Sequence, residues 1–326
     1  MITPAKFSIF ITTVNTMLGE AYTTTPTLYD KFTTTIPMDS EYLTFGWTGM
    51  LPQMRPWVGS RVAFEHAPQT YTVGALPFES TLAVDRFDLD DDKFGIYYRD
   101  IPDIARQAKR WPDLQMRNLL ENASPWTSNF QLGLDGLTHW NTAHAVDLYD
   151  SSKSTYCNDF TGGGQTIGGI LIGGAFGATS FKTLYEYQLT LKAEDGEPMG
   201  LTPRTLMYPP QLHGEVELVL KNESFAPPAW GTITGQVGAA DNIFRRYGVE
   251  PLMNPLLKSA TKFYLLNEGG GGIKPFAFGL REAPNFVQRI SENDPVVFDD
   301  HKYLFGNWAR GCPAWSFAWL SARSGS

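Results

Sequence analysis

The sequence has few of the residues that build disulfide frameworks and metal centres. Among its 326 residues only Cys157 and Cys312 are cysteines, and no CxxC or Cys/His spacing accompanies them. Neither a disulfide framework nor a zinc site is therefore indicated, and we expect a reduced compartment. His139 and His144 are five residues apart, which is a poor spacing for joint metal binding on one helix face. We interpret them as ordinary surface or core histidines.

Long apolar runs and clusters of basic residues are also missing. The longest mostly apolar run, from Gly168 to Gly177, has about half the length needed to cross a bilayer. Polar residues between Thr12 and Thr16 interrupt the N-terminal apolar stretch, so we expect no signal peptide. The net charge of -8 and the absence of any Lys/Arg run argue against binding DNA by neutralising its phosphates.

Familiar catalytic motifs do not occur in this sequence. There is no G-x-S-x-G and no H-E-x-x-H, and the glycine-rich segment 162–177 lacks both the Gly-Lys-Ser/Thr ending and the G-x-G-x-x-G register of phosphate loops. A calcium loop starting at Asp88 would need glutamate at position 99 and glycine at position 93, which are Arg99 and Lys93. We therefore expect no catalytic residue, no cofactor and no metal.

Hydrophobic residues, in contrast, are plentiful. They make up 42% of the chain, with 13% aromatic, which is enough for one large or two moderate packed domains. The nine tryptophans could form carbohydrate platforms, but core and interface anchors are the commoner use of such rings.

The first forty residues have the pattern of a helical arm. Their apolar residues recur at three- and four-residue steps on one helix face, with Thr3 as a cap, Pro4 in the first turn and Gly19 as the end. This face can pack on the chain's own core or dock on a neighbouring subunit, and the long Thr-rich tether after Gly19 favours docking. The residues concerned are Phe7, Phe10, Ile11, Val14, Met17 and Leu18.

Two runs with strand character follow. Residues 61–66 and 71–76 flank Ala67-Pro68-Gln69, which predicts a hairpin with its tip near Gln69. A two-stranded hairpin is marginal alone in water and needs a surface to lie on, either in a local sheet or on another subunit. A further strand is predicted over Phe78–Phe87, with Phe78, Leu82 and Val84 on one face.

Two helices are predicted in the middle of the chain. The first runs from Ile96 to Glu121, with a kink or a restart at Pro112, and the second from Thr179 to Ala193. Near the C-terminus, alternation of Trp315, Phe317 and Trp319 with small residues predicts a strand with one aromatic face. Segments 286–290, 296–298 and 303–305 complete a late β-rich unit that is expected to pack on the first of these helices.

Spaced residues at both ends of the chain resemble the major head subunit family of Mu-like tailed phages. Each piece is weak alone, but their order at both ends makes the signal specific, whereas residues 156–177 and 225–240 match little. The pieces are Gly46-Trp47-x-Gly49, Pro52, Trp57-Val58-Gly59-x-Arg61, Tyr71, Phe78-Glu79-x-Thr81, Val84-x-Arg86, Asp91-Asp92-x-x-Gly95-Ile96-Tyr97, Lys274-Pro275, Arg281-x-Ala283-Pro284, Phe286-Val287, Asp294 to Phe298, Ala309-Arg310-Gly311 and Trp315.

The resemblance implies an α+β chain with the Hong Kong 97-type fold of tailed-phage major capsid proteins. It implies an N-terminal arm over 1–40 and an extended β-hairpin loop with its base over 41–95. A discontinuous peripheral domain, with a long spine helix, would comprise 96–150 plus 275–326. An axial domain would comprise 151–274.

The implied function is a virion capsid protein that assembles in the bacterial cytoplasm into hexamers and pentamers around double-stranded DNA. Expected partners are further copies, a separate scaffold or protease, a portal and a decoration protein, with no membrane and no sequence-specific DNA contact. A nanocompartment shell of the same fold, and a β-rich binding module or hydrolase, remain alternatives. Candidate intersubunit contacts are Phe7, Phe10, Val14, Trp47, Trp57, Arg61, Gln69 and Tyr71.

Overall fold

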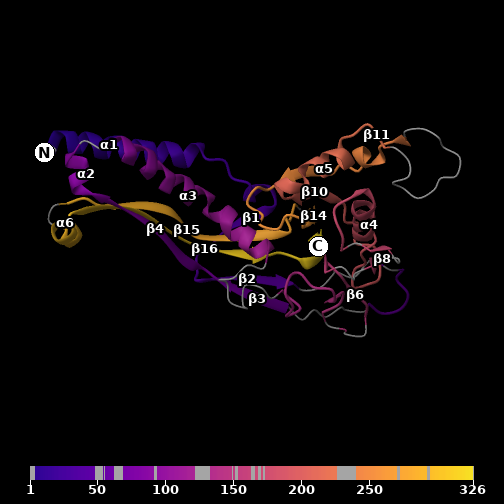
Figure 1. Cartoon of the computed structure of the whole chain (residues 1–326). Coiled ribbons are helices and arrows are strands. Elements are labelled where there is room, and N and C mark those ends of the chain that lie inside the picture. The colour runs from indigo at the N-terminus through magenta and orange to yellow at the C-terminus, as the bar shows by residue number, and fades with distance from the viewer. Residues whose placement is uncertain are drawn as a thin grey trace.

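The computed structural model is an elongated molecule in which one long sheet leads into a second, smaller body (Figure 1). It describes residues 4–47, 54, 56–61, 69–91, 94–121, 133–148, 150, 153–162, 166–167, 170–171, 173–225, 240–269, 272–291 and 294–325. No helix among these residues is both long enough and apolar enough to cross a membrane.

The long sheet joins strands from both ends of the chain. Its order is β1 (Thr33–Pro37), β15 (Phe276–Arg289), β16 (Lys302–Trp315) and β4 (Leu76–Asp85). β1 runs parallel to β15, and the other neighbours are antiparallel. The predicted strand over Phe78–Phe87 is confirmed as far as Asp85, where β4 ends, and its even-numbered residues from Phe78 onward face inward.

Two helices cover one face of this sheet. α1 (Pro4–Thr24) and α3 (Phe94–Leu120) pack on each other, and α3 also packs along β16. The helix predicted over 96–121 is thus confirmed, but α3 continues through Pro112 without restarting. The Trp111 ring is buried between Phe78 and Phe278 and anchors that turn to the sheet. This packing offsets the free-energy cost of the backbone hydrogen bond that Pro112 cannot donate. A Cβ at Gly311 would lie 2.9 Å from the Trp111 ring, so glycine gives that ring its room.

α1 differs from the predicted arm in its length and in its packing. It continues past Gly19 to Thr24, and the hydroxyls of Thr23, Thr24 and Thr25 donate to carbonyls four residues earlier. Its apolar face is buried against α3 and the sheet, among Ile101 and Phe305. This packing supports the interpretation as a helix on the subunit's own core, and contact of the helix with a neighbouring subunit stays a prediction.

Truncation of this face should destabilise the isolated subunit. Phe10 is 1% exposed, so Phe10→Ala should lower the free energy of unfolding by about 3–5 kcal/mol. Ile9, 64% exposed on the same helix, is the matched control, and Ile9→Ala should change it by no more than about 0.5 kcal/mol. Urea unfolding monitored by circular dichroism measures both, and equal effects would contradict the assigned packing of α1.

A two-stranded sheet lies on the other face of the long sheet. β2 (Tyr42–Trp47) pairs antiparallel with β3 (Gln69–Gly74), and the two strands share an apolar cluster with Ala277, Cys312 and Ala314. The predicted position of Gln69 in the turn of a hairpin is wrong, because Gln69 begins β3 and pairs with Trp47. The other strand of that predicted hairpin was expected over residues 61–66, and its residues 62–66 lie outside the described residues.

The second body is built around a five-stranded sheet. Its order is β13 (Glu250–Met253), β10 (Pro203–Tyr208), β14 (Phe263–Asn267), β17 (Ser321–Gly325) and β7 (Asp159–Thr161). α4 (Ala178–Leu189) and α5 (His213–Leu220) pack on it, so the predicted second helix is confirmed with an earlier end. Small two-stranded pairs complete it: β5 (His144–Ala145) with β6 (Thr155–Tyr156), β8 (Thr166–Ile167) with β9 (Ile170–Leu171), and β11 (Ser224–Phe225) with β12 (Ala240–Asp241).

The C-terminal segment divides between the two sheets. β16 ends at Trp315, Ser316 donates its N–H to the Pro275 carbonyl, and residues Ala318–Leu320 form a 3-10 turn before β17 joins the second sheet. The predicted aromatic strand is thus wrong beyond Trp315. Residues 321–325 pair in the second sheet and not with the strands that pack on α3.

Two short helices lie beside the outer end of the long sheet (Figure 1). They are α2 (Arg86–Asp90) and α6 (Pro295–Asp300). Residues 296–298 were expected in a strand, but Asp294 caps α6 through the N–H of Val296 and Pro295 occupies its first turn.

Candidate subunit interface

The described residues hold no group of three or more histidine, cysteine, aspartate or glutamate side chains placed to bind a metal. Two other features of the described residues are an exposed surface and the junction between the two sheets.

Three of the predicted contact residues hold the β2–β3 pair to its own subunit. Trp47 packs its ring on Phe317 and Trp319, with centroids 5.0 and 5.4 Å away, and its Nε1 donates to Glu194 at 3.2 Å. Tyr71 donates its hydroxyl to the Trp315 carbonyl. Gln69 lies in register with Trp47. The structure thus gives all three an intrachain role at the base of the segment that joins β2 to β3.

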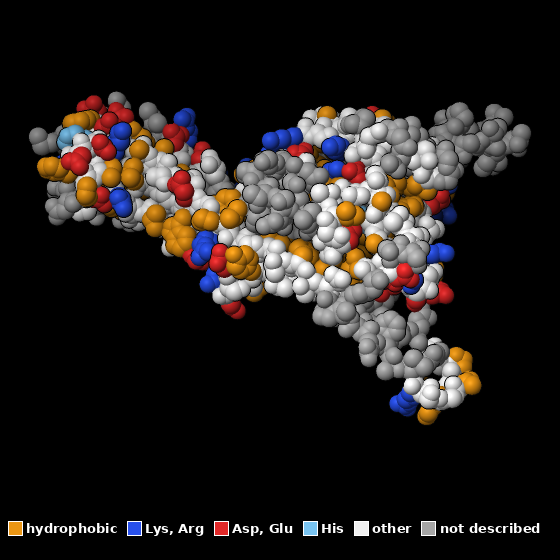
Figure 2. All heavy atoms as spheres, turned by 90° about the horizontal axis from the view of Figure 1, so that it is seen from below, with side chains coloured by type: hydrophobic (Ala, Val, Ile, Leu, Met, Phe, Trp, Pro, Cys, Tyr) orange, Lys and Arg blue, Asp and Glu red, His pale blue; other side chains and the backbone are white. Residues whose placement is uncertain are grey.

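Trp57 and Arg61 are brought together on the described part of that joining segment. The guanidinium of Arg61 lies 4.9 Å from the centre of the Trp57 ring, and Trp57 Nε1 donates to the Gly59 carbonyl at 2.7 Å. Gly59 has φ 81°, which favours glycine and turns the chain back toward Trp57. Trp57 is 73% exposed, and Met54 and Val58 are exposed as well. Figure 2 shows hydrophobic and basic side chains at the end of a projection that stands away from the body.

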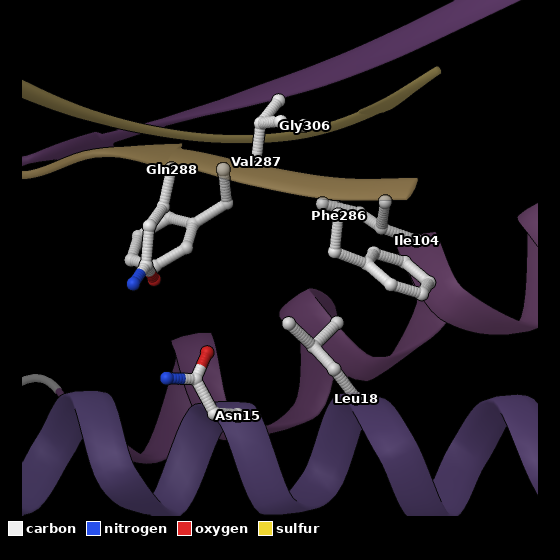
Figure 3. Close-up of a pocket in the computed structure, with 8 residues that line it drawn as sticks. Asn15, Leu18, Ile104, Phe286, Val287, Gln288 and Gly306 are labelled. Carbon is white, nitrogen blue, oxygen red and sulfur yellow. The ribbon is translucent and has the colours of Figure 1, made fainter. Parts of the chain in front are cut away.

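A groove between α1 and β15 is a surface that sequence reasoning missed. It has a volume of about 90 Å³ and lies where α1, α3 and the strands β15 and β16 meet (Figure 3). The alternation around Phe286 predicted a strand, but only the position of α1 reveals that the strand borders an open groove. Its lining residues are Asn15, Leu18, Ile104, Phe286, Val287, Gln288, Phe305 and Gly306.

Phe7, Phe10 and Val14, the remaining candidates, do not belong to this exposed surface. Phe10 and Val14 are buried, and the Phe7 ring packs 4.9 Å from that of Tyr303. Within the chain they support the wall of the subunit, and their contact with a second subunit stays a prediction.

A buried polar cluster joins the two sheets where β16 gives way to β17. Arg323 binds both carboxylate oxygens of Asp159, at 2.9 and 2.7 Å, and lies 5.0 Å from the Trp140 ring. Burial raises the pKa of the Asp159 carboxyl, but the hydrogen bonds and charge of Arg323 outweigh it, so the net pKa is lowered. Since both side chains are largely buried, the pair fastens β17 to β7.

Two histidines complete this cluster. His144 Nδ1 lies 2.5 Å from Asp135 Oδ2, and its Nε2 donates to the His139 carbonyl at 2.8 Å. The ring of His139 stacks on Trp315 at 3.9 Å, and its Nε2 lies 2.7 Å from the Ser321 hydroxyl. Complete burial, with the charges of His144 and Arg323, lowers the pKa of His139 far below its usual value. Of the two predicted alternatives, surface or core histidines, the structure shows the core one, since both side chains are buried.

Stability should therefore fall on mild acidification. His139 stays neutral in the folded chain but takes up a proton in the unfolded chain below about pH 6.5, so its contribution is present above that pH and declines below it. Asp159 adds a second loss below about pH 4, because its folded pKa is lowered. Urea unfolding between pH 8 and pH 5 measures the first effect, and His139→Gln should flatten the slope. An unchanged slope in that variant would contradict this assignment.

Solved structures define the class of fold. The chain matches the procapsid of bacteriophage JBD30 with a TM-score of 0.53 and 22% identity, covering 100% of this chain and 76% of that one. It matches a structure titled Microbacterium phage Oxtober96 with a TM-score of 0.54 and 10% identity, covering 92% and 90%. The fold is that of tailed-phage major capsid proteins, mixed helix and sheet of the Hong Kong 97 type.

Sequence comparison gives the family. The family model "Mu-like prophage major head subunit gpT" matches residues 7–168 and 250–325, so the chain belongs to this family of structural head subunits. The major capsid protein of Escherichia phage Mu is 27% identical over 122 residues, 37% of this chain and 40% of that protein. The Mu-like prophage FluMu major head subunit of Haemophilus influenzae is 24% identical over 143 residues, 42% and 44%. The chain thus spans about two fifths of the length of these relatives.

Proposed function

We propose that this protein is the major shell-forming subunit of a Mu-like phage head, and that its copies close an icosahedral capsid around double-stranded DNA. The observation that carries the proposal is the family match at both ends of the chain, because those ends form α1, α3 and the long sheet. The relatives are phage head proteins, which favours a phage capsid over a nanocompartment.

In this proposal α3 and the long sheet form the peripheral domain, and the second sheet forms the axial domain. The segment between β2 and β3 is the extended loop, with its base fixed by Trp47 and Tyr71 on the subunit's own body. The proposed boundary differs from the sequence-based one at residues 321–325, which pair in the second sheet.

The negative net charge of the subunit is compatible with a shell that encloses DNA without binding it tightly. A net charge of -8 disfavours adhesion of the packaged DNA, so the DNA is held by the closed wall and not by neutralised phosphates. A scaffold or protease and a portal are proposed as further partners, with assembly in the host cytoplasm. One matched structure is a JBD30 capsid decorated with minor capsid protein trimers, and we extend a decoration partner of that kind to this chain.

Expression with the neighbouring head genes, followed by negative-stain microscopy, tests this function. We expect closed particles of uniform diameter, because many weak contacts become strong collectively in a closed symmetric shell. A product that remains monomeric under those conditions would contradict the proposal.

A further inference from the structure

Strand β17 occupies an inner position of the second sheet, although it follows every other strand of that sheet in the sequence. It pairs antiparallel with β14 on one side and parallel with β7 on the other. Between β14 and β17 the chain leaves this sheet to form β15 and β16 of the long sheet, and it returns through the 3-10 turn at Ala318–Leu320. β17 therefore lies in a slot whose two walls are made by earlier segments.

The place of β7 in the sheet depends on β17. Among the described residues, β7 pairs with no strand other than β17. The N–H of Arg323 also donates to the carbonyl of Asn158, the residue before β7, at 2.8 Å. Without β17, the sheet would consist of β13, β10 and β14 alone, and β7 would lose its only strand partner among the described residues.

β17 contributes little to the apolar core of the second body. All five residues of Ser321–Gly325 are buried, yet only Ala322 joins the large apolar cluster of β10, β14, α4 and α5. None of the five is β-branched or aromatic, so strand propensity does not hold them in place. Because little apolar area is buried, the strand is held mainly by its two backbone ladders and by polar contacts.

Those polar contacts join the second body to the long sheet. Arg323, which pairs with Asp159 of β7, also donates from Nη1 to the carbonyl of Leu120, the last residue of α3, at 3.5 Å. The Ser321 hydroxyl lies 2.7 Å from Nε2 of His139, whose ring stacks on Trp315 at the end of β16. Insertion of β17 therefore fixes the second body against α3 and the long sheet.

We infer that β17 is a closing strand. The two apolar cores form first, and insertion of residues 321–325 between β14 and β7 then makes the subunit competent to enter a shell. Contacts between segments distant in sequence form late, because loop closure must be paid before they contribute. A strand that buries little apolar area also opens at a lower free energy than the core around it. The link to assembly rests on the proposed function, since a closed symmetric shell requires one fixed subunit geometry.

Thiol labelling of the free subunit tests whether β17 opens separately. Ser324 is 0% exposed, and Ser324→Cys changes a single atom in the slot. The matched control is Val216→Cys, equally buried on α5 within the apolar cluster. Both are made in a Cys157→Ser background, and the labelling of Cys312 measured in that parent is subtracted. Under native conditions the thiol in β17 should react at least about tenfold faster than the thiol in α5. Equal rates would overturn the inference, because only unfolding of the whole subunit would then expose either thiol.

Gly325 gives a way to oppose insertion without changing the core. Its φ is 125°, and a Cβ there would lie against the Thr261 carbonyl and 2.7 Å from Lys262 Cα. Backbone atoms cannot yield easily to such contacts, so Gly325→Ala should speed the labelling of Ser324→Cys at least about another tenfold, with the far-UV circular dichroism retained. The control Gly196→Ala also has a positive φ, 87°, but open space for a Cβ, and should leave the labelling unchanged.

Shell assembly tests the consequence for function. Gly325→Ala should raise the subunit concentration needed for assembly at least about tenfold, because fewer subunits are in the competent state, whereas Gly196→Ala should not. In assembled shells the labelling of Ser324→Cys should fall to the rate of Val216→Cys, since lattice contacts favour the closed state.

Labelling in shells as fast as in the free subunit, or an unchanged assembly threshold in Gly325→Ala, would contradict the closing role of β17. If the Cys157→Ser parent forms no shells, the proposed function fails instead, and the comparison of Ser324→Cys with Val216→Cys in the free subunit still decides whether β17 opens on its own.

Discussion

Trp315→Ala should lower the free energy of unfolding of the isolated subunit by about 3–5 kcal/mol. The ring is 1% exposed and packs against His139, Trp140 and Phe276 at the point where the long sheet ends. Removing it opens a cavity among rings that belong to both halves of the molecule. Chemical denaturation of the free subunit measures the loss before any assembly takes place.

Phe317→Ala is the informative comparison for that variant. Phe317 is only partly buried and stacks on Trp319, 4.7 Å away, beneath Trp47. Its truncation should therefore cost clearly less stability than that of Trp315 and should act mainly on the anchoring of β2. If Phe317→Ala destabilises the subunit as much as Trp315→Ala, the turn assigned after β16 is wrong and residue 317 lies in the core.

Loss of the Arg323 side chain should be equally severe. Arg323→Met removes the two hydrogen bonds that the guanidinium donates to the Asp159 carboxylate and leaves a buried charge without its counter-ion, which typically costs about 3–5 kcal/mol. Only the Thr161 N–H and hydroxyl then donate to that carboxylate among the described groups. The surface pair of Arg246 and Asp241 is the matched control, because both of its side chains are mostly exposed and such pairs contribute about 0–1 kcal/mol. Unfolding curves for Arg323→Met and Arg246→Met compare the two.

A double variant separates the charge from the packing. Adding Asp159→Leu to Arg323→Met removes the stranded carboxylate, so it should recover much of the lost stability. If the double variant is no more stable than Arg323→Met alone, the cost arises from lost contacts of the arginine side chain with Trp140 and not from the buried charge.

Local patterns predicted the elements whose packing is regular. The spacing of apolar residues in α3 and the alternation in β4 identified both elements, because each buries one face against a large neighbour. The resemblance at both chain ends then gave the class of fold. These signals are local or come from a family pattern, and neither depends on the geometry of distant contacts.

The incorrect predictions share one physical cause, which is pairing between segments that are distant in the sequence. Gln69 appeared to lie at a hairpin tip because its nearest apolar runs flank it, yet the partner of β3 is β2, more than twenty residues earlier. The alternation of Phe317 and Trp319 looked like a strand, but the ladder ends at Trp315. The α1–β15 groove had no sequence signal, because four separate elements build it.

Cryo-electron microscopy of particles made with the neighbouring head genes tests the shell function most directly. The account predicts a closed icosahedral lattice in which every subunit has the long sheet under α1 and α3, and the second sheet with β17 between β14 and β7. Open filaments, or a subunit whose long sheet does not combine β4 with β15 and β16, would contradict it.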